Sequence, residues 1–223
     1  MNKQIAIENA IAKIPDGASI MVGGFGNPGT PFALINELLK QGQRHLVIIK
    51  NDANEESIGI SKLIENGQVE KLITSHIGLN KMVIDLMNRE AIDVEFFPQG
   101  ILAEKIRNAG AGCFGFLTDI GIDTEITDKS RIIKFQGKAV IIEPALYADF
   151  ALIHARRSDK YGNLTYGSSA MNFNPLMAMA ANQVIVETHN LVASDEQSPE
   201  CIHTPSAFVT SIVKIDSLAH EDK

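Results

Sequence analysis

Cysteine is scarce in this sequence, and the two that are present, Cys113 and Cys201, lie far apart in the chain. Neither belongs to a Cys-x-x-Cys pair, and the six histidines form no His-x-x-x-His pair. Zinc and similar transition-metal sites need ligands that are clustered in this way. We therefore expect no metal site, and we expect two reduced thiols in a cytoplasmic protein.

Clusters of basic side chains are also missing. The chain has 20 lysines and arginines against 27 aspartates and glutamates, a net charge of −7, and its longest basic run is the pair Arg156-Arg157. A protein that binds nucleic acid needs a concentrated basic surface to neutralise phosphates. We therefore expect no nucleic-acid partner, and we expect Arg156 and Arg157 to be solvated.

Long apolar runs are absent as well. No stretch has the length that crossing a bilayer requires, and the first residues contain no signal-peptide core. We expect no membrane association. With 223 residues, 45% of them hydrophobic, the chain can bury one sizeable core, so we expect one domain over residues 1–223.

Apolar residues follow two alternating patterns through the first hundred residues. Helical spacing predicts helices over 3–14, 32–39, 58–66 and 81–89, and a further helix after residues 98–100. Short continuous apolar runs predict strands over 20–22, 45–50, 69–75 and 92–97. This alternation predicts an α/β fold, in which an open, mostly parallel sheet is covered by helices on both faces.

The pattern changes after Gly110. Two strand-like runs, 131–135 and 139–143, are separated by Gln136-Gly137-Lys138, which predicts a hairpin in a small antiparallel insertion. The parallel pattern resumes with strands over 148–155 and 184–187, and a helix over 176–181 lies between them. We expect residues after about 190 to form mainly loops and residues 220–223 to be frayed.

The most distinctive segment runs from Asp16 to Pro31. An apolar strand leads into a loop that contains four glycines, Gly23, Gly24, Gly26 and Gly29. Thr30 suits the N-cap of the next helix and Pro31 suits its first turn. Glycines let backbone N–H groups approach an anion, and a helix start adds partial positive charge. We interpret the segment as a ligand loop, because a structural turn requires only one or two of these glycines.

The same loop has an alternative interpretation. Gly24, Gly26 and Gly29 spell Gly-x-Gly-x-x-Gly after a strand, and Asp52 follows the next strand, as in dinucleotide-binding proteins. In that motif the helix already runs through the later glycines, where a proline removes a needed N–H. Pro28 and Pro31 therefore argue against a nicotinamide site.

Polar side chains follow the other predicted strands. Asn51 and Asp52, Ser75 and His76, and Gln99 each lie just past a strand end, so they and loop 23–30 can share one crevice. Amides suit the stabilisation of a developing oxyanion better than proton abstraction. An Asx turn is the alternative explanation of Asn51-Asp52.

Two side chains have the chemistry for catalysis but lack the context. No serine or cysteine is placed by the sequence as a nucleophile beside His76, so we expect a buried, hydrogen-bonded histidine. Cys113 lies in a glycine-rich loop, where a small buried side chain is commoner than a reactive thiolate.

Further motifs accompany the glycine loop. They are N-D-A-N at 51–54, S-H-I-G at 75–78, P-Q-G-x-L-x-E-x-I-R at 98–107, G-N-L-T-Y at 162–166 and N-F-N-P at 172–175. Together with Asp16-Gly17, Gly23-Gly24-Phe25, Gly29 and Pro31, they resemble the A-type chain of heteromeric family I coenzyme A transferases. The resemblance covers nearly the whole chain and fills every specified position of the family's first signature.

This resemblance implies a transfer of coenzyme A from a short-chain acyl-CoA to a free carboxylic acid of the acetate, acetoacetate or butyrate class. Coenzyme A is then a substrate and not a permanently bound cofactor. The resemblance assigns the coenzyme A loop to Gly24, Phe25, Gly26, Asn27, Pro28, Gly29 and Thr30. It assigns oxyanion stabilisation and substrate positioning to Gln99 and Asn51. The resemblance also implies an A2B2 complex in which the nucleophilic glutamate belongs to the B-type partner chain. In the implied reaction this glutamate first forms an acyl anhydride and then a thioester with coenzyme A.

One local motif imitates that nucleophile. The family's glutamate lies in Ser-Glu-Asn-Gly, and this chain contains Glu65-Asn66-Gly67, but Ile64 precedes it. We interpret these residues as a helix C-cap with Gly67 in the left-handed conformation, and not as the catalytic motif.

Other functions stay open at this point. A 3-oxoacid transferase acting on succinyl-CoA or 3-oxoadipate is the nearest alternative, and a Rossmann-type dehydrogenase is a more distant one. A sugar-phosphate isomerase needs an acidic base that no residue here obviously supplies. A non-catalytic module that only binds acyl-CoA is the last alternative.

Overall fold

A computed structural model describes residues 2–125 and 127–217. The expected fraying of residues 220–223 lies outside this part of the chain. No helix in the described residues has the length and apolar composition needed to cross a membrane.

The centre of the molecule is a seven-stranded sheet in the order β13-β11-β8-β1-β2-β3-β4. All neighbouring strands in it are parallel. The strands are β1 (Ser19–Val22), β2 (Leu46–Ile49), β3 (Val69–Thr74), β4 (Asp93–Phe96), β8 (Ala148–His154), β11 (Ala181–Thr188) and β13 (Ser211–Lys214). The predicted parallel α/β sheet is confirmed.

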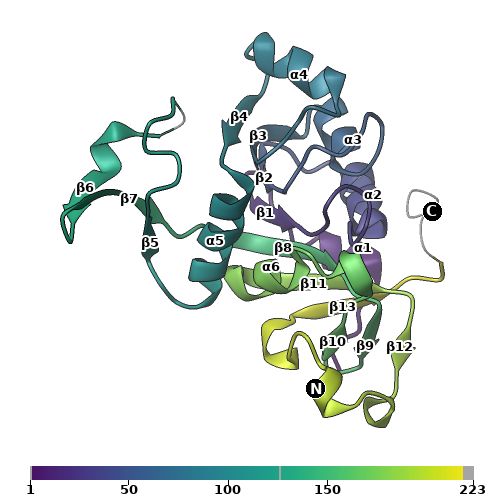
Figure 1. The fold of residues 1–223 in the computed structure, drawn as a ribbon. Helices are drawn as coiled ribbons and strands as arrows, with labels where there is room; N and C mark the ends of the chain where they lie inside the picture. Colours follow the sequence, from purple (N-terminus) through teal and green to yellow (C-terminus); the bar gives the residue numbers. More distant parts are fainter. Residues whose placement is uncertain (1, 126, 218–223) are drawn as a thin grey trace.

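Helices cover both faces of this sheet (Figure 1). They are α1 (Ile7–Ile11), α2 (Phe32–Gln41), α3 (Ile60–Glu65), α4 (Lys81–Asn88), α5 (Gln99–Gly110) and α6 (Asn174–Ala180). Successive residues of a strand point to opposite faces, and both faces here are buried. Ile48 of β2 packs in the core with α1–α4, whereas its neighbour Ile49 packs in a second core with α5 and α6. This explains why the strands are continuously apolar in the sequence.

The two ends of the described chain differ from prediction. Helix α1 is much shorter than the expected 3–14, because Lys3 and Ile5 exchange backbone hydrogen bonds with Ile212 of β13, each at 2.9 Å. Strand β13 lies where the sequence predicts loop. Its four residues are too few for a clear pattern, and pairing with β11 makes them a strand.

The insertion after α5 is a three-stranded antiparallel sheet that projects from the body of the molecule (Figure 1). It consists of β5 (Gly115–Thr118), β6 (Ile132–Phe135) and β7 (Lys138–Pro144). The hairpin is confirmed, with Gln136 at φ 48° and Gly137 at φ 82°, the left-handed pair that a two-residue turn requires. A buried ion pair between Lys105 and Glu143, at 2.9 Å, ties the insertion to α5.

A second small sheet contains β9 (Arg157–Asp159), β10 (Leu164–Thr165) and β12 (Leu191–Val192). Short 3-10 helices lie in the connections: η1 (Lys129–Arg131), η2 (Ser168–Ala170), η3 (Ser194–Glu196), η4 (Pro199–Cys201) and η5 (Ser206–Phe208). Arg156 and Arg157 are exposed, as predicted.

Candidate functional site

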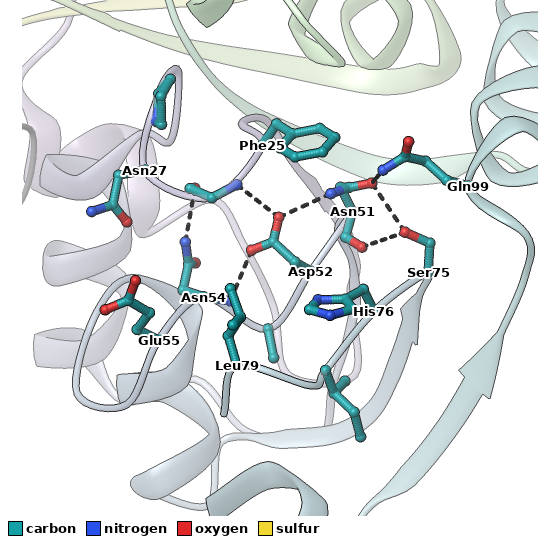
Figure 2. Close-up of a pocket in the computed structure, with 14 residues that line it drawn as sticks. Phe25, Asn27, Asn51, Asp52, Asn54, Glu55, Ser75, His76, Leu79 and Gln99 are labelled. Carbon is teal, nitrogen blue, oxygen red and sulfur yellow. Dashed lines mark hydrogen bonds between the residues drawn. The ribbon is translucent and has the colours of Figure 1, made fainter. Parts of the chain in front are cut away.

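The carboxyl ends of β1 to β4 surround a pocket of about 610 Å³. Figure 2 shows side chains from four separate segments converging on it. Its lining includes Phe25, Gly26, Asn27, Pro28, Asn51, Asp52, Asn54, Glu55, Ser75, His76, Leu79 and Gln99. The polar residues that were predicted to share one crevice therefore do so. Gly24, Gly29 and Thr30 belong to the same loop but do not line this pocket.

Close packing within the protein explains several of the loop glycines. A Cβ on Gly24, at φ 106°, would lie 2.1 Å from Thr30 Oγ1, and one on Gly29, at φ 78°, would lie 2.4 Å from the Ala170 carbonyl oxygen. Nothing lies within 4 Å of the corresponding position at Gly26, which faces the pocket. The glycines therefore fold the loop tightly, and only part of the loop is left to meet a ligand.

The start of α2 is capped differently from the prediction. Thr30 makes no capping bond, and its hydroxyl instead donates to the Gly26 carbonyl at 2.7 Å. The backbone N–H of Leu34, in the first turn, donates to Glu187 Oε2 at 3.0 Å. Glu187 is fully buried and its other oxygen lies 3.0 Å from His154 Nδ1. The partial positive charge of this helix start is thus satisfied by a carboxylate from β11 and not left for an anion.

The helix start also decides against the dinucleotide motif. Helix α2 begins at Phe32, after the third glycine, as Pro28 and Pro31 predict. A dinucleotide-binding loop would already be helical at that point.

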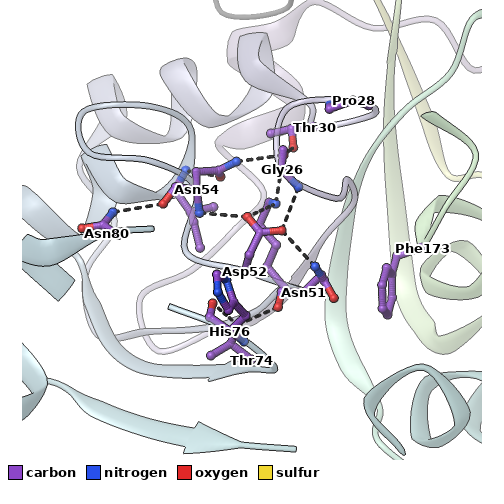
Figure 3. A network of polar contacts seen from close by, with 12 residues as sticks. Gly26, Pro28, Thr30, Asn51, Asp52, Asn54, Thr74, His76, Asn80 and Phe173 are labelled. Carbon is purple, nitrogen blue, oxygen red and sulfur yellow. Dashed lines mark hydrogen bonds and ion pairs between the residues drawn. The ribbon is translucent and has the colours of Figure 1, made fainter. Parts of the chain in front are cut away.

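A buried ion pair between Lys50 and Asp52 supports the glycine loop, and Figure 3 shows Asp52 below Gly26 of that loop. Lys50 is fully buried, and its Nζ lies 3.2 Å from Asp52 Oδ1 and 3.4 Å from the Gly26 carbonyl. Asp52 Oδ2 accepts the Gly26 N–H at 2.8 Å and Asn51 Nδ2 at 3.0 Å. Asp52 Oδ1 also accepts the Asn54 N–H at 2.9 Å, so the Asx turn is present as well. The Asp52 carboxylate is therefore committed to positioning the loop.

Both members of this pair have shifted pKa values. Burial lowers the pKa of Lys50, although the Asp52 charge opposes that effect. Burial pushes the pKa of Asp52 upward, but the Lys50 charge and the hydrogen bonds from Gly26, Asn51 and Asn54 outweigh it, so the pKa lies below 3.8.

The Asp52 shift predicts how stability depends on pH. A carboxyl whose pKa is lower in the folded state contributes stability that is complete above 3.8 and is lost as the pH falls through the folded pKa. Between about pH 4 and pH 2, the free energy of unfolding should fall more steeply for the wild type than for Asp52→Asn. Denaturant titrations at several pH values measure the two slopes, and equal slopes would contradict this role of Asp52.

A chain of amide contacts leads from Asn51 to Gln99. Asn51 is buried, and its Oδ1 accepts hydrogen bonds from Gln99 Nε2 at 2.8 Å and from Ser75 Oγ at 3.0 Å. Gln99 is exposed at the start of α5, and its Oε1 makes no hydrogen bond within the described residues. Both acceptor positions of Asn51 Oδ1 are thus occupied, and Asn51 fixes the orientation of Gln99, whose carboxamide keeps hydrogen-bonding capacity for a ligand.

Two predictions about reactive side chains were wrong. His76 is exposed and lines the pocket, and its imidazole makes no hydrogen bond within the described residues. Its backbone pairs with Asp52 at the strand ends, which turns the side chain outward. Cys113 is also exposed, because it follows the last turn of α5 at the surface.

Glu65 lies outside this pocket, at the end of α3. Asn66 is the C-cap, Gly67 has φ 68°, and the Gly67 N–H donates to the Ile64 carbonyl. The predicted C-cap turn is confirmed.

Of the two motifs at 162–166 and 172–175, only the second contacts the glycine loop in the part of the chain that the structure describes. Asn172 Nδ2 donates to the Pro28 carbonyl at 2.9 Å, and Asn174 Nδ2 donates to the Gly29 carbonyl at 3.0 Å, so the second motif supports the glycine loop. Leu164 and Tyr166 are instead buried away from the pocket, where the Tyr166 hydroxyl bonds Thr204.

The sequence did not predict the two buried charged residues, Lys50 and Glu187, that contact the glycine loop and the start of α2. By its pattern, Lys50 is only the end of one apolar strand, and Glu187 is only part of another. The one available signal was a charged residue inside a run otherwise typical of buried strands, since a buried charge needs a partner.

Known proteins resemble this chain over nearly its whole length. A family model described as coenzyme A transferase matches residues 4–215. The chain is 44% identical to the alpha chain of the acetate CoA-transferase of Escherichia coli K12, over 95% of this chain and 96% of that protein. It is 39% identical to the A-type chain of the 3-oxoadipate CoA-transferase of Acinetobacter baylyi, over 95% and 93%.

A similar solved structure is an acyl-CoA transferase from Escherichia coli O157:H7 in a thioester complex with CoA. The TM-score is 0.84 and the identity is 25%, and the match covers 97% of this chain. It covers 48% of that transferase, so the present chain spans about half the length of the solved chain.

Proposed function

This chain belongs to the coenzyme A transferase family, and we propose that it is the A-type chain of a cytoplasmic A2B2 enzyme that moves coenzyme A from an acyl-CoA to a free carboxylic acid. Its relatives are named as alpha or A-type members of their enzymes, which implies a B-type partner chain. The observation that carries the proposal is the pocket at the strand ends, in which an oriented Gln99 carboxamide faces open space.

The pocket supports a division of labour between two chains. Attack on a thioester needs a carboxylate that is free to react. The Asp52 carboxylate is engaged by Lys50 and by three N–H donors, and so is a poor nucleophile. We therefore assign the attacking glutamate to the B-type partner chain, as the resemblance implies.

Within the proposed site, the residues of this chain bind and orient. Gln99 Nε2 donates a hydrogen bond to the oxyanion that forms at the thioester carbonyl, and Asn51 holds Gln99 in place. Phe25, Gly26, Asn27 and Pro28 form the wall against which coenzyme A lies. Gly24, Gly29 and Thr30 shape that wall from behind.

Mass spectrometry of trapped intermediates tests where the nucleophile lies. When the complex with the B-type chain is incubated with acetyl-CoA and quenched, the enzyme–CoA adduct should map to a glutamate peptide of that partner. Recovery of the adduct on Asp52 or Glu55 of this chain would overturn the assignment.

Ligand-induced stabilisation tests the binding function of the chain itself. At 100 times its Kd, a ligand that binds only the folded state adds about 2.7 kcal/mol, which raises the Tm of a domain of this size by about 5–10 °C. We expect coenzyme A to produce such a shift and NADH to produce none. A shift with NADH and none with coenzyme A would restore the dehydrogenase interpretation.

The proposed function also requires a choice of the two acids between which coenzyme A moves. We propose monocarboxylic acids of the acetate, acetoacetate or butyrate class, supported by 44% identity to the acetate enzyme. Transfer involving 3-oxoadipate or succinate is the second candidate, supported by 39% identity to a 3-oxoadipate enzyme.

A further inference from the structure

A second cavity, of about 290 Å³, lies beside the first and shares Phe25 and Gln99 with it. Figure 2 shows these two side chains on the same side of the main pocket. The cavity extends between the start of α5 and the start of α6, where Ala103, Phe173 and Leu176 line it. In Figure 3, Phe173 lies to the right of Asn51 and of the Asp52 network.

The walls of this cavity are mainly apolar. Ala103, Phe173 and Leu176 belong to the core that packs between the sheet and helices α5 and α6. The described residues that line the cavity include no charged side chain, and its amides are Gln99 and Asn172. The neighbouring pocket adds the acidic Asp52 and Glu55, while Lys50 is fully buried and paired. Among the described residues that line the second cavity, a further carboxylate on a ligand would therefore find no cation, and the exposed imidazole of His76 lines only the neighbouring pocket.

The cavity has a polar mouth at the proposed reaction centre. Gln99 is the first residue of α5, and Ala103 lies one helical turn further on the same face. The first turn of α5 carries no acidic side chain, and Pro98 caps it with no side-chain bond. A carboxylate at this mouth therefore meets the Gln99 carboxamide and the partial positive charge of a helix start.

We infer that this cavity binds the hydrocarbon tail of a short monocarboxylic acid or acyl group, and that Ala103 and Leu176 determine its length. The inference rests on the proposed function and adds to it where the tail of the monocarboxylic acid lies and which residues of this chain set its length. The carboxyl carbon lies at Gln99, within reach of both cavities, and the tail points toward Ala103. Acids with a second carboxylate are disfavoured, because the mainly apolar lining offers that charge no cation.

Opposite changes in cavity size test the inference in the complex with the B-type chain. One methylene in an apolar pocket changes kcat/KM by roughly 10- to 200-fold. Ala103→Leu fills the cavity, so the ratio of kcat/KM for butyrate to that for acetate should fall by roughly 10- to 100-fold. Leu176→Ala enlarges it, so the ratio of hexanoate to butyrate should rise. The matched control is Ala111→Leu, the same exchange at an exposed site beyond the end of α5, which should leave both ratios unchanged.

The preference of the wild-type complex for acids with one carboxylate over acids with two is a separate test of the inference. Succinate should be used at least about 100-fold less efficiently than butyrate, because its second carboxylate would lie against an apolar lining that holds no cation. Efficient transfer to succinate would overturn the inference even though transferase activity is present. The same holds if neither Ala103→Leu nor Leu176→Ala changes its ratio of kcat/KM values.

A binding readout separates this inference from the proposed function. With methyl-labelled protein, sodium butyrate should shift the NMR signals of Ala103 and Leu176 saturably, and sodium succinate should not. Shifts in the absence of any CoA transfer would support the cavity and reject the transferase role. Unshifted methyl signals at saturating butyrate would reject the cavity assignment.

Discussion

Gln99→Ala should lower the turnover of the complex with the B-type chain by roughly 100- to 1000-fold, since one oxyanion donor is worth about 3–4 kcal/mol of barrier. Gln99 suits this role because it is exposed at the pocket, while its Nε2 is held 2.8 Å from Asn51 Oδ1. Steady-state kinetics with acetyl-CoA and butyrate measure the effect, which should appear mainly in kcat because the bond forms in the transition state. A loss below threefold would count against the role.

Two further variants define how Gln99 is positioned. Gln4→Ala, an equal truncation at an exposed site far from the pocket, should leave turnover unchanged. Asn51→Ala should reduce kcat by removing the acceptor that orients Gln99. If Asn51 acts through Gln99, the double variant should be hardly slower than Gln99→Ala alone. Fully multiplicative losses would show that Asn51 contributes independently.

Asp52→Asn should destabilise the protein by about 3–5 kcal/mol, because it leaves the buried Lys50 ammonium without its counter-charge. The N–H groups of Gly26 and Asn54 would also lose a charged acceptor. Urea denaturation should show a lower midpoint at an unchanged m-value. Asp119→Asn, at an exposed aspartate, should have little effect.

The double variant Lys50→Met with Asp52→Asn distinguishes an uncompensated charge from simple loss of contacts. Removing both charges of a buried pair is often nearly neutral, so the double variant should be more stable than Asp52→Asn alone. If the second substitution adds to the loss, the pair contributes chiefly through packing. In either case, coenzyme A binding should weaken, because both residues fix the carbonyl or N–H of Gly26.

Local patterns predicted most of the architecture and part of the site. The alternation of apolar runs and helical spacings predicts the order of β1 to α5, since each element is specified within ten or so neighbouring residues. The placing of Asn51, Ser75 and Gln99 after successive strands predicts their meeting, because parallel strands end at the same edge of a sheet. The exposure of His76 and Cys113 was beyond this reasoning, because burial depends on neighbours from other segments.

The sequence by itself determined the parallel α/β sheet, the glycine loop that ends before α2, and the polar residues at the strand ends. These follow from spacing and residue type, which act over short stretches of chain. Only the tertiary structure decided that Glu187 rather than Thr30 satisfies the start of α2, that Asp52 occupies the Gly26 N–H, and that β13 completes the sheet. It also formed the apolar cavity between α5 and α6. The physical reason is the same in each case: the contacting groups are far apart in the sequence, and no local pattern records which distant residue becomes a partner.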